Sequence, residues 1–120
     1  MDTNKLKNII KKIFINHKLS NSHAIICANA LINAELVGAP SHGLSRLKMY
    51  CDRINKKTIN PRPKIKIKKI SSSVAHIDAN NSIGFVAAEI GMKQAIKSAK
   101  KTGIGSVSYT HLTLPTKRIV

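Results

Sequence analysis

The chain has 120 residues, enough for one small domain and too few for a two-domain enzyme. Its 21 Lys and Arg residues against 5 Asp and Glu residues give a net charge of +16, and its 42% hydrophobic residues exclude an acidic or weakly hydrophobic disordered chain. Aromatic residues make up only 3% and Trp is absent, which argues against a protein that stacks bases on aromatic faces.

The positive charge has two readings. Most basic residues are Lys, and Ile and Asn are also frequent, as AT-rich coding DNA produces. Arg, the better bidentate partner of phosphate and guanine, occurs at four positions: Arg46, Arg53, Arg62 and Arg118. We therefore attribute the charge to codon usage and expect no nucleic-acid partner, while a small basic nucleic-acid-binding module stays as the alternative function.

The cysteine pattern and the hydropathy indicate a cellular setting. Cys27 and Cys51 fit neither a close metal-ligand spacing nor a disulfide framework. No stretch approaches the roughly 18 apolar residues of a membrane span, and Lys11 and Lys12 interrupt the apolar residues near the N-terminus. We expect a cytoplasmic chain without a membrane partner and without a bound metal.

Three helices are predicted in the first half of the chain. Thr3 is the expected cap of a helix with one apolar stripe and a solvated Lys-rich face. The next helix, about 22–37, is apolar on most sides and should be buried, with Cys27 as a small hydrophobic residue. Ser41 is the expected N-cap of a third helix, whose apolar face has Leu44, Leu47, Cys51 and Ile54.

Strands appear only in the second half. Residues 55–64 are predicted to be a loop, and residues 64–68 and 74–78 alternate as two strands that can form a hairpin. Asn80 and Asn81 are expected to turn the chain into a fourth helix over about 85–101, which Gly103 caps. A further strand should start within 104–107.

The densest polar cluster lies in residues 38–46. His42 would occupy the first turn of the third helix, where the helix dipole favours a neutral imidazole that can exchange protons. Gly43 would leave space for a ligand, and Arg46, four residues on, would present its guanidinium to a substrate carboxylate. Ser41 would either orient His42 or only cap the helix. The alternative is a surface His and a surface Arg without a catalytic role.

The segment Ala34-Glu35-Leu36-Val37-Gly38-Ala39-Pro40-Ser41-His42-Gly43-Leu44-Ser45-Arg46-Leu47 resembles the opening of the malate/L-lactate dehydrogenase-like, non-Rossmann oxidoreductases. Residues 78–84 are similar to that family's D-x-x-x-x-x-G turn, and residues 91–105 are similar to the helix and glycine exit that follow. The S-H-G-x-x-R core is the most specific part of a resemblance that spans about residues 6–105.

The resemblance implies an NAD- or NADP-dependent oxidoreductase that interconverts 2-hydroxy acids and 2-oxo acids. It implies that His42 is the catalytic proton donor or acceptor, that Ser41 supports it, and that Arg46 binds the substrate carboxylate. Family members are typically cytoplasmic homodimers, and their cofactor-binding residues lie mostly beyond the segment that this chain matches. We therefore expect an N-terminal fragment that is inactive by itself.

The last residues break the resemblance. Residues 107–116 resemble the translation of a transposon-type sequencing adapter, and His111 does not match the family's second histidine motif. We accordingly predict a mixed α/β fold in three parts. Residues 1–60 form a helical segment with the S-H-G motif, residues 61–106 start the α/β dehydrogenase domain with a two-stranded unit, a helix and a strand, and residues 107–120 are a non-native tail.

Overall fold

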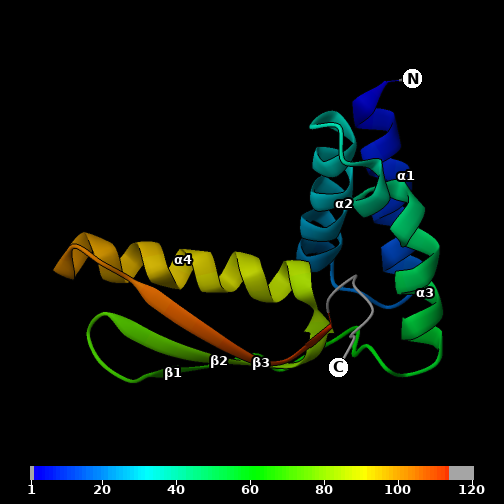
Figure 1. Cartoon of the computed structure of the whole chain (residues 1–120). Helices are drawn as coiled ribbons and strands as arrows, with labels where there is room; N and C mark the ends of the chain where they lie inside the picture. The colour runs from blue at the N-terminus through cyan, green and yellow to red at the C-terminus, as the bar shows by residue number, and fades with distance from the viewer. Residues whose placement is uncertain (1, 114–120) are drawn as a thin grey trace.

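The computed structural model describes residues 2–113 and places a helical bundle beside a small sheet that is covered by one long helix (Figure 1). The bundle contains α1 (Thr3–Asn16), α2 (Asn21–Leu36) and α3 (Leu47–Asn55), with the short 3₁₀ helices η1 (Pro40–His42) and η2 (Leu44–Arg46) between the last two. The second part contains β1 (Lys66–Lys69), β2 (Val74–Ile83), α4 (Gly84–Thr102) and β3 (Ser106–Thr113). The predicted mixed α/β class and the order of elements are confirmed.

The core lies in the bundle because α2 offers apolar side chains on several faces. The predicted burial of this helix holds for one stripe, since Ile25 is 39% exposed, and the buried residues are Ala24, Cys27, Ala28, Leu31 and Ile32. From α1 the buried residues are Ile10 and Phe14, which follow the predicted stripe. Burial raises the pKa of the Cys27 thiol to about 12, so this cysteine is a core residue rather than a nucleophile.

The first helix is capped one residue earlier than predicted. A carboxylate oxygen of Asp2 accepts the backbone N–H of Asn4 at 3.0 Å, and Thr3 is already the first helical residue. The carboxylate satisfies a backbone donor that has no partner within the helix. At α2 the hydroxyl of Ser20 plays this part by accepting the N–H of His23 at 3.3 Å.

The four α-helices end in two different ways. After α2 and α4 the chain turns through Gly38 and Gly103, whose φ angles of 80° and 88° lie in the left-handed region, and the predicted Gly103 cap is confirmed. After α1 and α3 the same region is occupied by Lys18 and Lys57, with φ angles of 76° and 63°. A side chain in this region costs about 1 kcal/mol relative to glycine.

The sheet has the order β1-β2-β3, with β1 antiparallel and β3 parallel to the central strand. The predicted hairpin is confirmed, and Lys66 lies opposite Asp78 in it. In β2 the residues Ala75, Ile77 and Ala79 alternate into the buried face, which α4 covers in Figure 1. The opposite face of β2 is only partly buried and polar.

The predicted turn at Asn80 and Asn81 is wrong, because β2 continues through both residues to Ile83. Both asparagines have positive φ angles, of 51° and 61°, and the pairing with β3 shifts register between Asp78 and Ser82. A bulge, rather than a turn, absorbs these two residues. Asn tolerates the left-handed region better than other side chains, so the strand can bend without ending.

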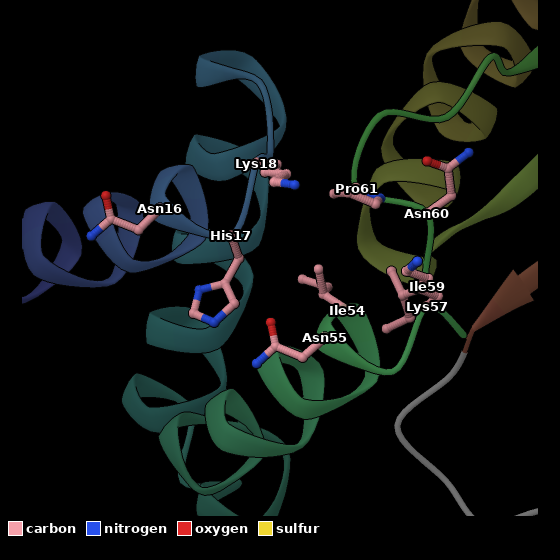
Figure 2. A pocket seen from close by; sticks show the side chains of 9 residues that line it. All are labelled: Asn16, His17, Lys18, Ile54, Asn55, Lys57, Ile59, Asn60 and Pro61. Carbon is pink, nitrogen blue, oxygen red and sulfur yellow. The ribbon is translucent and has the colours of Figure 1, made fainter.

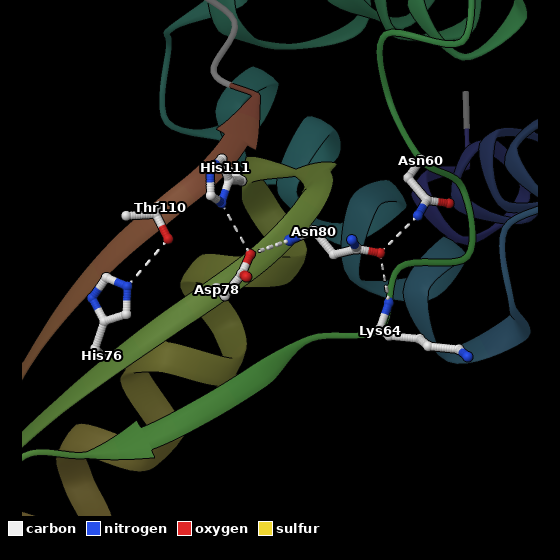
Figure 3. A network of polar contacts seen from close by, with 7 residues as sticks. All are labelled: Asn60, Lys64, His76, Asp78, Asn80, Thr110 and His111. Atoms are coloured by element: carbon white, nitrogen blue, oxygen red, sulfur yellow. Dashed lines mark hydrogen bonds and ion pairs between the residues drawn. The ribbon is translucent and has the colours of Figure 1, made fainter.

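A polar network fixes this bulge to the loop that leaves the bundle (Figure 3). The side-chain oxygen of Asn80 accepts hydrogen bonds from the Asn60 amide at 2.9 Å and from the Lys64 backbone N–H at 3.1 Å. On the other side, Asp78 accepts the N–H of Asn80 at 3.0 Å and the ring Nδ1 of His111 lies 3.2 Å away. The network therefore joins β2, β3 and the loop that connects the sheet to the helices.

The expectation that residues 107–120 are non-native stays a prediction. Residues 107–113 lie in β3, and residues 114–120 lie outside the described residues.

None of the helices within residues 2–113 has both the length and the apolar character needed to cross a membrane.

Candidate functional site

The S-H-G segment forms two successive 3₁₀ turns between α2 and α3 instead of a helix start. Ser41 and His42 end the first turn, and Gly43 separates it from the second. Because α3 begins only at Leu47, the prediction that Ser41 caps this helix is wrong. The helix dipole predicted to act on His42 is absent for the same reason, since no α-helix begins there. Pro40, which starts the first turn, fixes its backbone torsion in a helical value.

The structure brings the three predicted site residues together. The Ser41 hydroxyl lies 3.0 Å from Nδ1 of His42, and the Nε of Arg46 donates a 2.7 Å hydrogen bond to the Ser41 carbonyl oxygen. Ser41 and His42 are exposed, whereas Arg46 is half-buried, with an Nη1 contact to the sulfur of Met49 at 4.0 Å. The Arg46 side chain therefore stabilises the turn through its hydrogen bond to the Ser41 backbone.

The contact with Ser41 leaves Nε2 of His42 open. No described residue forms a hydrogen bond with this nitrogen. When a protonated Nδ1 donates to the Ser41 hydroxyl, Nε2 of the neutral ring is a free base, and a second proton on Nε2 gives an imidazolium that can donate it. With Nδ1–H held by Ser41, Nε2 can therefore take up a proton in one direction of a reaction and release it in the other.

Glu35, near the end of α2, stabilises the turn, and this part was not predicted from the sequence. Its Oε1 accepts the backbone N–H of Leu44 at 2.9 Å. A Cβ added at the buried Gly43 would stand 2.5 Å from the same oxygen, so the missing side chain leaves room for this carboxylate. The prediction that Gly43 leaves space for a ligand is therefore wrong. The available signal was the presence of Glu35, one of only five acidic residues, inside the family-like segment.

Tyr50 follows the motif but takes no part in the exposed site. Its side chain is fully buried and meets the Phe85 ring edge-on, with ring centroids 5.4 Å apart. Burial, reinforced by Cys27, raises the pKa of Tyr50 to about 12. The phenol therefore keeps its proton near neutral pH. Its hydroxyl has no hydrogen-bond partner among the described residues.

Gly103 and Gly105 do not form a phosphate-binding turn for a dinucleotide. Gly103 and Gly105 follow the carboxyl end of α4, whose exposed carbonyls carry partial negative charge and disfavour an anion. A Cβ at Gly105 would collide with the backbone carbonyl of Ala95, so this glycine permits packing on α4. Within residues 2–113 no three His, Cys, Asp or Glu side chains gather to hold a metal ion.

Comparison with known proteins identifies the family of the chain. The family model for malate/L-lactate dehydrogenase matches residues 1–113. The chain is 41% identical over 101 residues to the malate/(S)-sulfolactate dehydrogenase of Methanothermus fervidus, covering 84% of the chain and 30% of that protein. It is 32% identical over 107 residues to the ureidoglycolate dehydrogenase (NAD(+)) of Escherichia coli, covering 89% of the chain and 31% of that protein.

The solved structures give the same result. The malate dehydrogenase of Pyrococcus horikoshii superposes with a TM-score of 0.92 at 35% identity, over 95% of this chain and 33% of that one. The names of these relatives define a class of oxidoreductases that act on 2-hydroxy acids. The chain belongs to the malate/L-lactate dehydrogenase family and spans about a third of the length of the relatives it matches.

Proposed function

We propose that the chain is the proton-transfer segment of an oxidoreductase that interconverts 2-hydroxy acids and 2-oxo acids of the malate, lactate or ureidoglycolate type. The observation that supports this most directly is the 3.0 Å contact between Ser41 and Nδ1 of His42, which leaves Nε2 open to a substrate. The family match over residues 1–113 supports the substrate class.

In the reducing direction, the 2-oxo carbon gains a hydride and its oxygen gains a proton. His42 donates that proton from Nε2, and in the oxidising direction the same nitrogen removes it from the 2-hydroxyl group. Ser41 positions the ring. The hydride belongs to a nicotinamide cofactor, NAD or NADP, for whose phosphates Gly103 and Gly105 form no binding turn.

Arg46 is assigned to the substrate carboxylate. Its Nε is already used to hold the Ser41 carbonyl oxygen, so the Nη atoms of the guanidinium are the ones left to bind a carboxylate. This arrangement would place the carboxylate next to His42, because Arg46 and His42 both contact Ser41. A full-length protein of this kind is proposed to be a cytoplasmic homodimer.

The test uses the longest reading frame that contains this chain, read from genomic DNA across codon 106. We expect that protein to oxidise NADH or NADPH with a 2-oxo acid, and His42→Ala to lower kcat by about 100-fold to 10,000-fold, the usual contribution of a general acid. Arg46→Lys should mainly raise KM, because a lysine cannot bind a carboxylate through two nitrogens. The 120-residue chain alone should show no turnover.

A His42→Ala protein with unchanged kcat would overturn the proposed role and make His42 a surface residue. Measurable NADH or NADPH oxidation by the 120-residue chain would overturn the expectation that this segment is inactive alone, and would mean that it holds a complete site.

A further inference from the structure

A hollow of about 490 Å³ lies at the far end of α3 from the S-H-G turn. Its size falls within the roughly 300–1,000 Å³ of small-molecule sites. The walls come from the end of α1, from the end of α3 and from the loop that follows, and the lining residues are Asn16, His17, Lys18, Ile54, Asn55, Lys57, Ile59, Asn60 and Pro61. We call it the Lys18–Lys57 pocket.

The floor of this pocket is apolar. Ile54 and Ile59 are 7% and 1% exposed, so both are anchored in the core while still lining the hollow. Pro61 adds a further apolar surface from the loop. Figure 2 shows His17, Ile54 and Asn55 converging between the ends of α1 and α3. Such a floor fits the carbon skeleton of a small molecule rather than a bare ion.

The rim is positively charged. Lys18 and Lys57 line the pocket together with His17, and no carboxylate is among the lining residues. The Nδ1 of His17 lies 2.8 Å from the Ile13 carbonyl oxygen and therefore donates to it, which fixes the ring. Neither lysine forms an ion pair with a described carboxylate. The polar groups around the opening therefore suit an anionic ligand.

The backbone is strained in the same way at the two lysines. Both helices end in the same hydrogen-bonded turn, in which Lys18 N–H donates to Ile15 at 2.9 Å and Lys57 N–H donates to Ile54 at 3.0 Å. Both lysines have the positive φ angle that glycine takes at the ends of α2 and α4. The two strained helix ends without glycine thus meet at one pocket.

We propose that the Lys18–Lys57 pocket binds a small organic anion, with its charged oxygen group at the two lysines and its apolar part on Ile54 and Ile59. Helix carboxyl ends alone favour lysine, but that effect needs neither a hollow nor an apolar floor. The site is separate from the S-H-G turn, and the proposal does not depend on the proposed dehydrogenase function.

The experiment is an NMR titration of the 15N-labelled chain with four probes. Phenyl phosphate and benzoate carry both an anionic group and an apolar body, inorganic phosphate carries only the charge, and benzyl alcohol carries only the apolar body. We expect an aromatic anion to shift the amides of residues 16–18 and 54–61 and to bind at least tenfold more tightly than phosphate or benzyl alcohol. The stronger of the two aromatic anions identifies the head group as phosphate or carboxylate.

Variants separate the pocket from general charge. Lys18→Gly/Lys57→Gly should weaken binding at least tenfold while raising Tm, because glycine relieves the positive φ angles. Lys18→Asn/Lys57→Asn, which also tolerates this backbone, should weaken binding equally. The control Lys12→Gln/Lys97→Gln removes two exposed charges elsewhere and should change affinity less than twofold.

Three results would overturn the proposal. They are shifts that centre outside residues 16–18 and 54–61, equal loss of affinity in the control and pocket variants, and unchanged affinity in both pocket variants.

Discussion

Glu35 connects the last turn of α2 to the backbone that carries the site residues. Its carboxylate accepts the Leu44 N–H, and Gly43 is buried directly against it. Glu35 forms no hydrogen bond with Ser41 or His42, so Glu35 is a positioning residue. Its effect on His42 passes through the backbone of the turn.

We predict that Glu35→Ala loosens this turn. The Leu44 N–H loses its acceptor in a partly buried place, so the free energy of unfolding should fall by roughly 1–3 kcal/mol. Hydrogen exchange at the Leu44 amide should accelerate more than at the amides of α1. Glu35→Gln keeps an acceptor oxygen and should restore most of the protection. Equal exchange rates at Leu44 in the Ala variant and the parent would contradict the assigned role.

His23 makes the stability depend on pH. It shares the lining of a small cavity with Pro61, Pro63 and Val86, and burial lowers the pKa of its imidazole below the ordinary value of 6.5. The unfolded chain then binds this proton more readily than the folded chain does. Stability should accordingly be fully present above pH 6.5 and decline as the pH falls from 6.5 through the lower folded pKa.

His23→Gln should flatten that decline, because Gln has no charge to bury. The measurement is chemical unfolding of both proteins at pH 7.5 and at pH 5.5. The other four histidines are present in both proteins, so the difference between the two pH profiles isolates His23. Parallel profiles would show that burial of His23 does not affect folding.

At the scale of elements, the bulge in β2 holds the sheet to the helical bundle. The Asn80 side chain accepts two hydrogen bonds from the loop, at 2.9 Å and 3.1 Å, and the Asn60 N–H donates to the Asn81 carbonyl oxygen at 2.8 Å. Asn81 shares the positive φ angle, but its side chain forms no hydrogen bond with another described residue. A comparison of Asn80 with Asn81 therefore separates the cost of the positive φ angle from the contribution of the side-chain hydrogen bonds.

We predict that Asn80→Ala destabilises the chain more than Asn81→Ala. Both changes place alanine in the left-handed region at about 1 kcal/mol. Only the first removes an acceptor of two hydrogen bonds, which adds about another 1–2 kcal/mol. Urea unfolding of the two variants measures the difference. Equal losses would mean that the network contributes nothing beyond the backbone conformation.

The elements that could be predicted are those with a local signal. The stripe of α1, the apolar circumference of α2 and the glycine at the end of α4 each follow from neighbouring residues. The long β2 could not be predicted, because Asn80-Asn81 locally favours a turn and only the renewed pairing of Ser82 and Ile83 with β3 continues the strand beyond the bulge. The start of α3 was misplaced because Ser41 has the chemistry of a cap, while contacts from Glu35 and Arg46 fold the segment into two 3₁₀ turns.

In the candidate site, too, the residues that could be predicted are those with a local signal. Its three residues could be found because they lie within six positions of each other in a family-like motif, and the structure keeps them in contact. Glu35 could not be assigned, because its contact with Leu44 spans nine residues across a break between helices. The reason for Gly43 depends on that same contact.

At the scale of the whole molecule, the helices leave apolar surface uncovered. Met92 and Ile96 of α4 are 60% and 48% exposed, and Leu36 and Val37 at the end of α2 are 68% and 69% exposed. Met92 also lines a hollow between α2 and α4, together with Ile25 and Phe85. The chain spans only about a third of its relatives, so these faces are open in this chain.

We predict that the chain self-associates through this surface in spite of its +16 charge. Screening by salt weakens the repulsion between molecules but leaves the attraction between apolar faces, so association should increase between low salt and about 0.5 M NaCl. Met92→Lys/Ile96→Lys should reduce it, because both side chains point to solvent and the change leaves the core intact. Sedimentation velocity at two salt concentrations measures the effect, with Lys93→Met as the opposite control that extends the apolar face. The exposed face of α4 does not cause the association if the chain stays monomeric at 0.5 M NaCl, or if none of the three substitutions changes its association.

If association instead decreases with salt, charge pairing rather than apolar contact holds the molecules together.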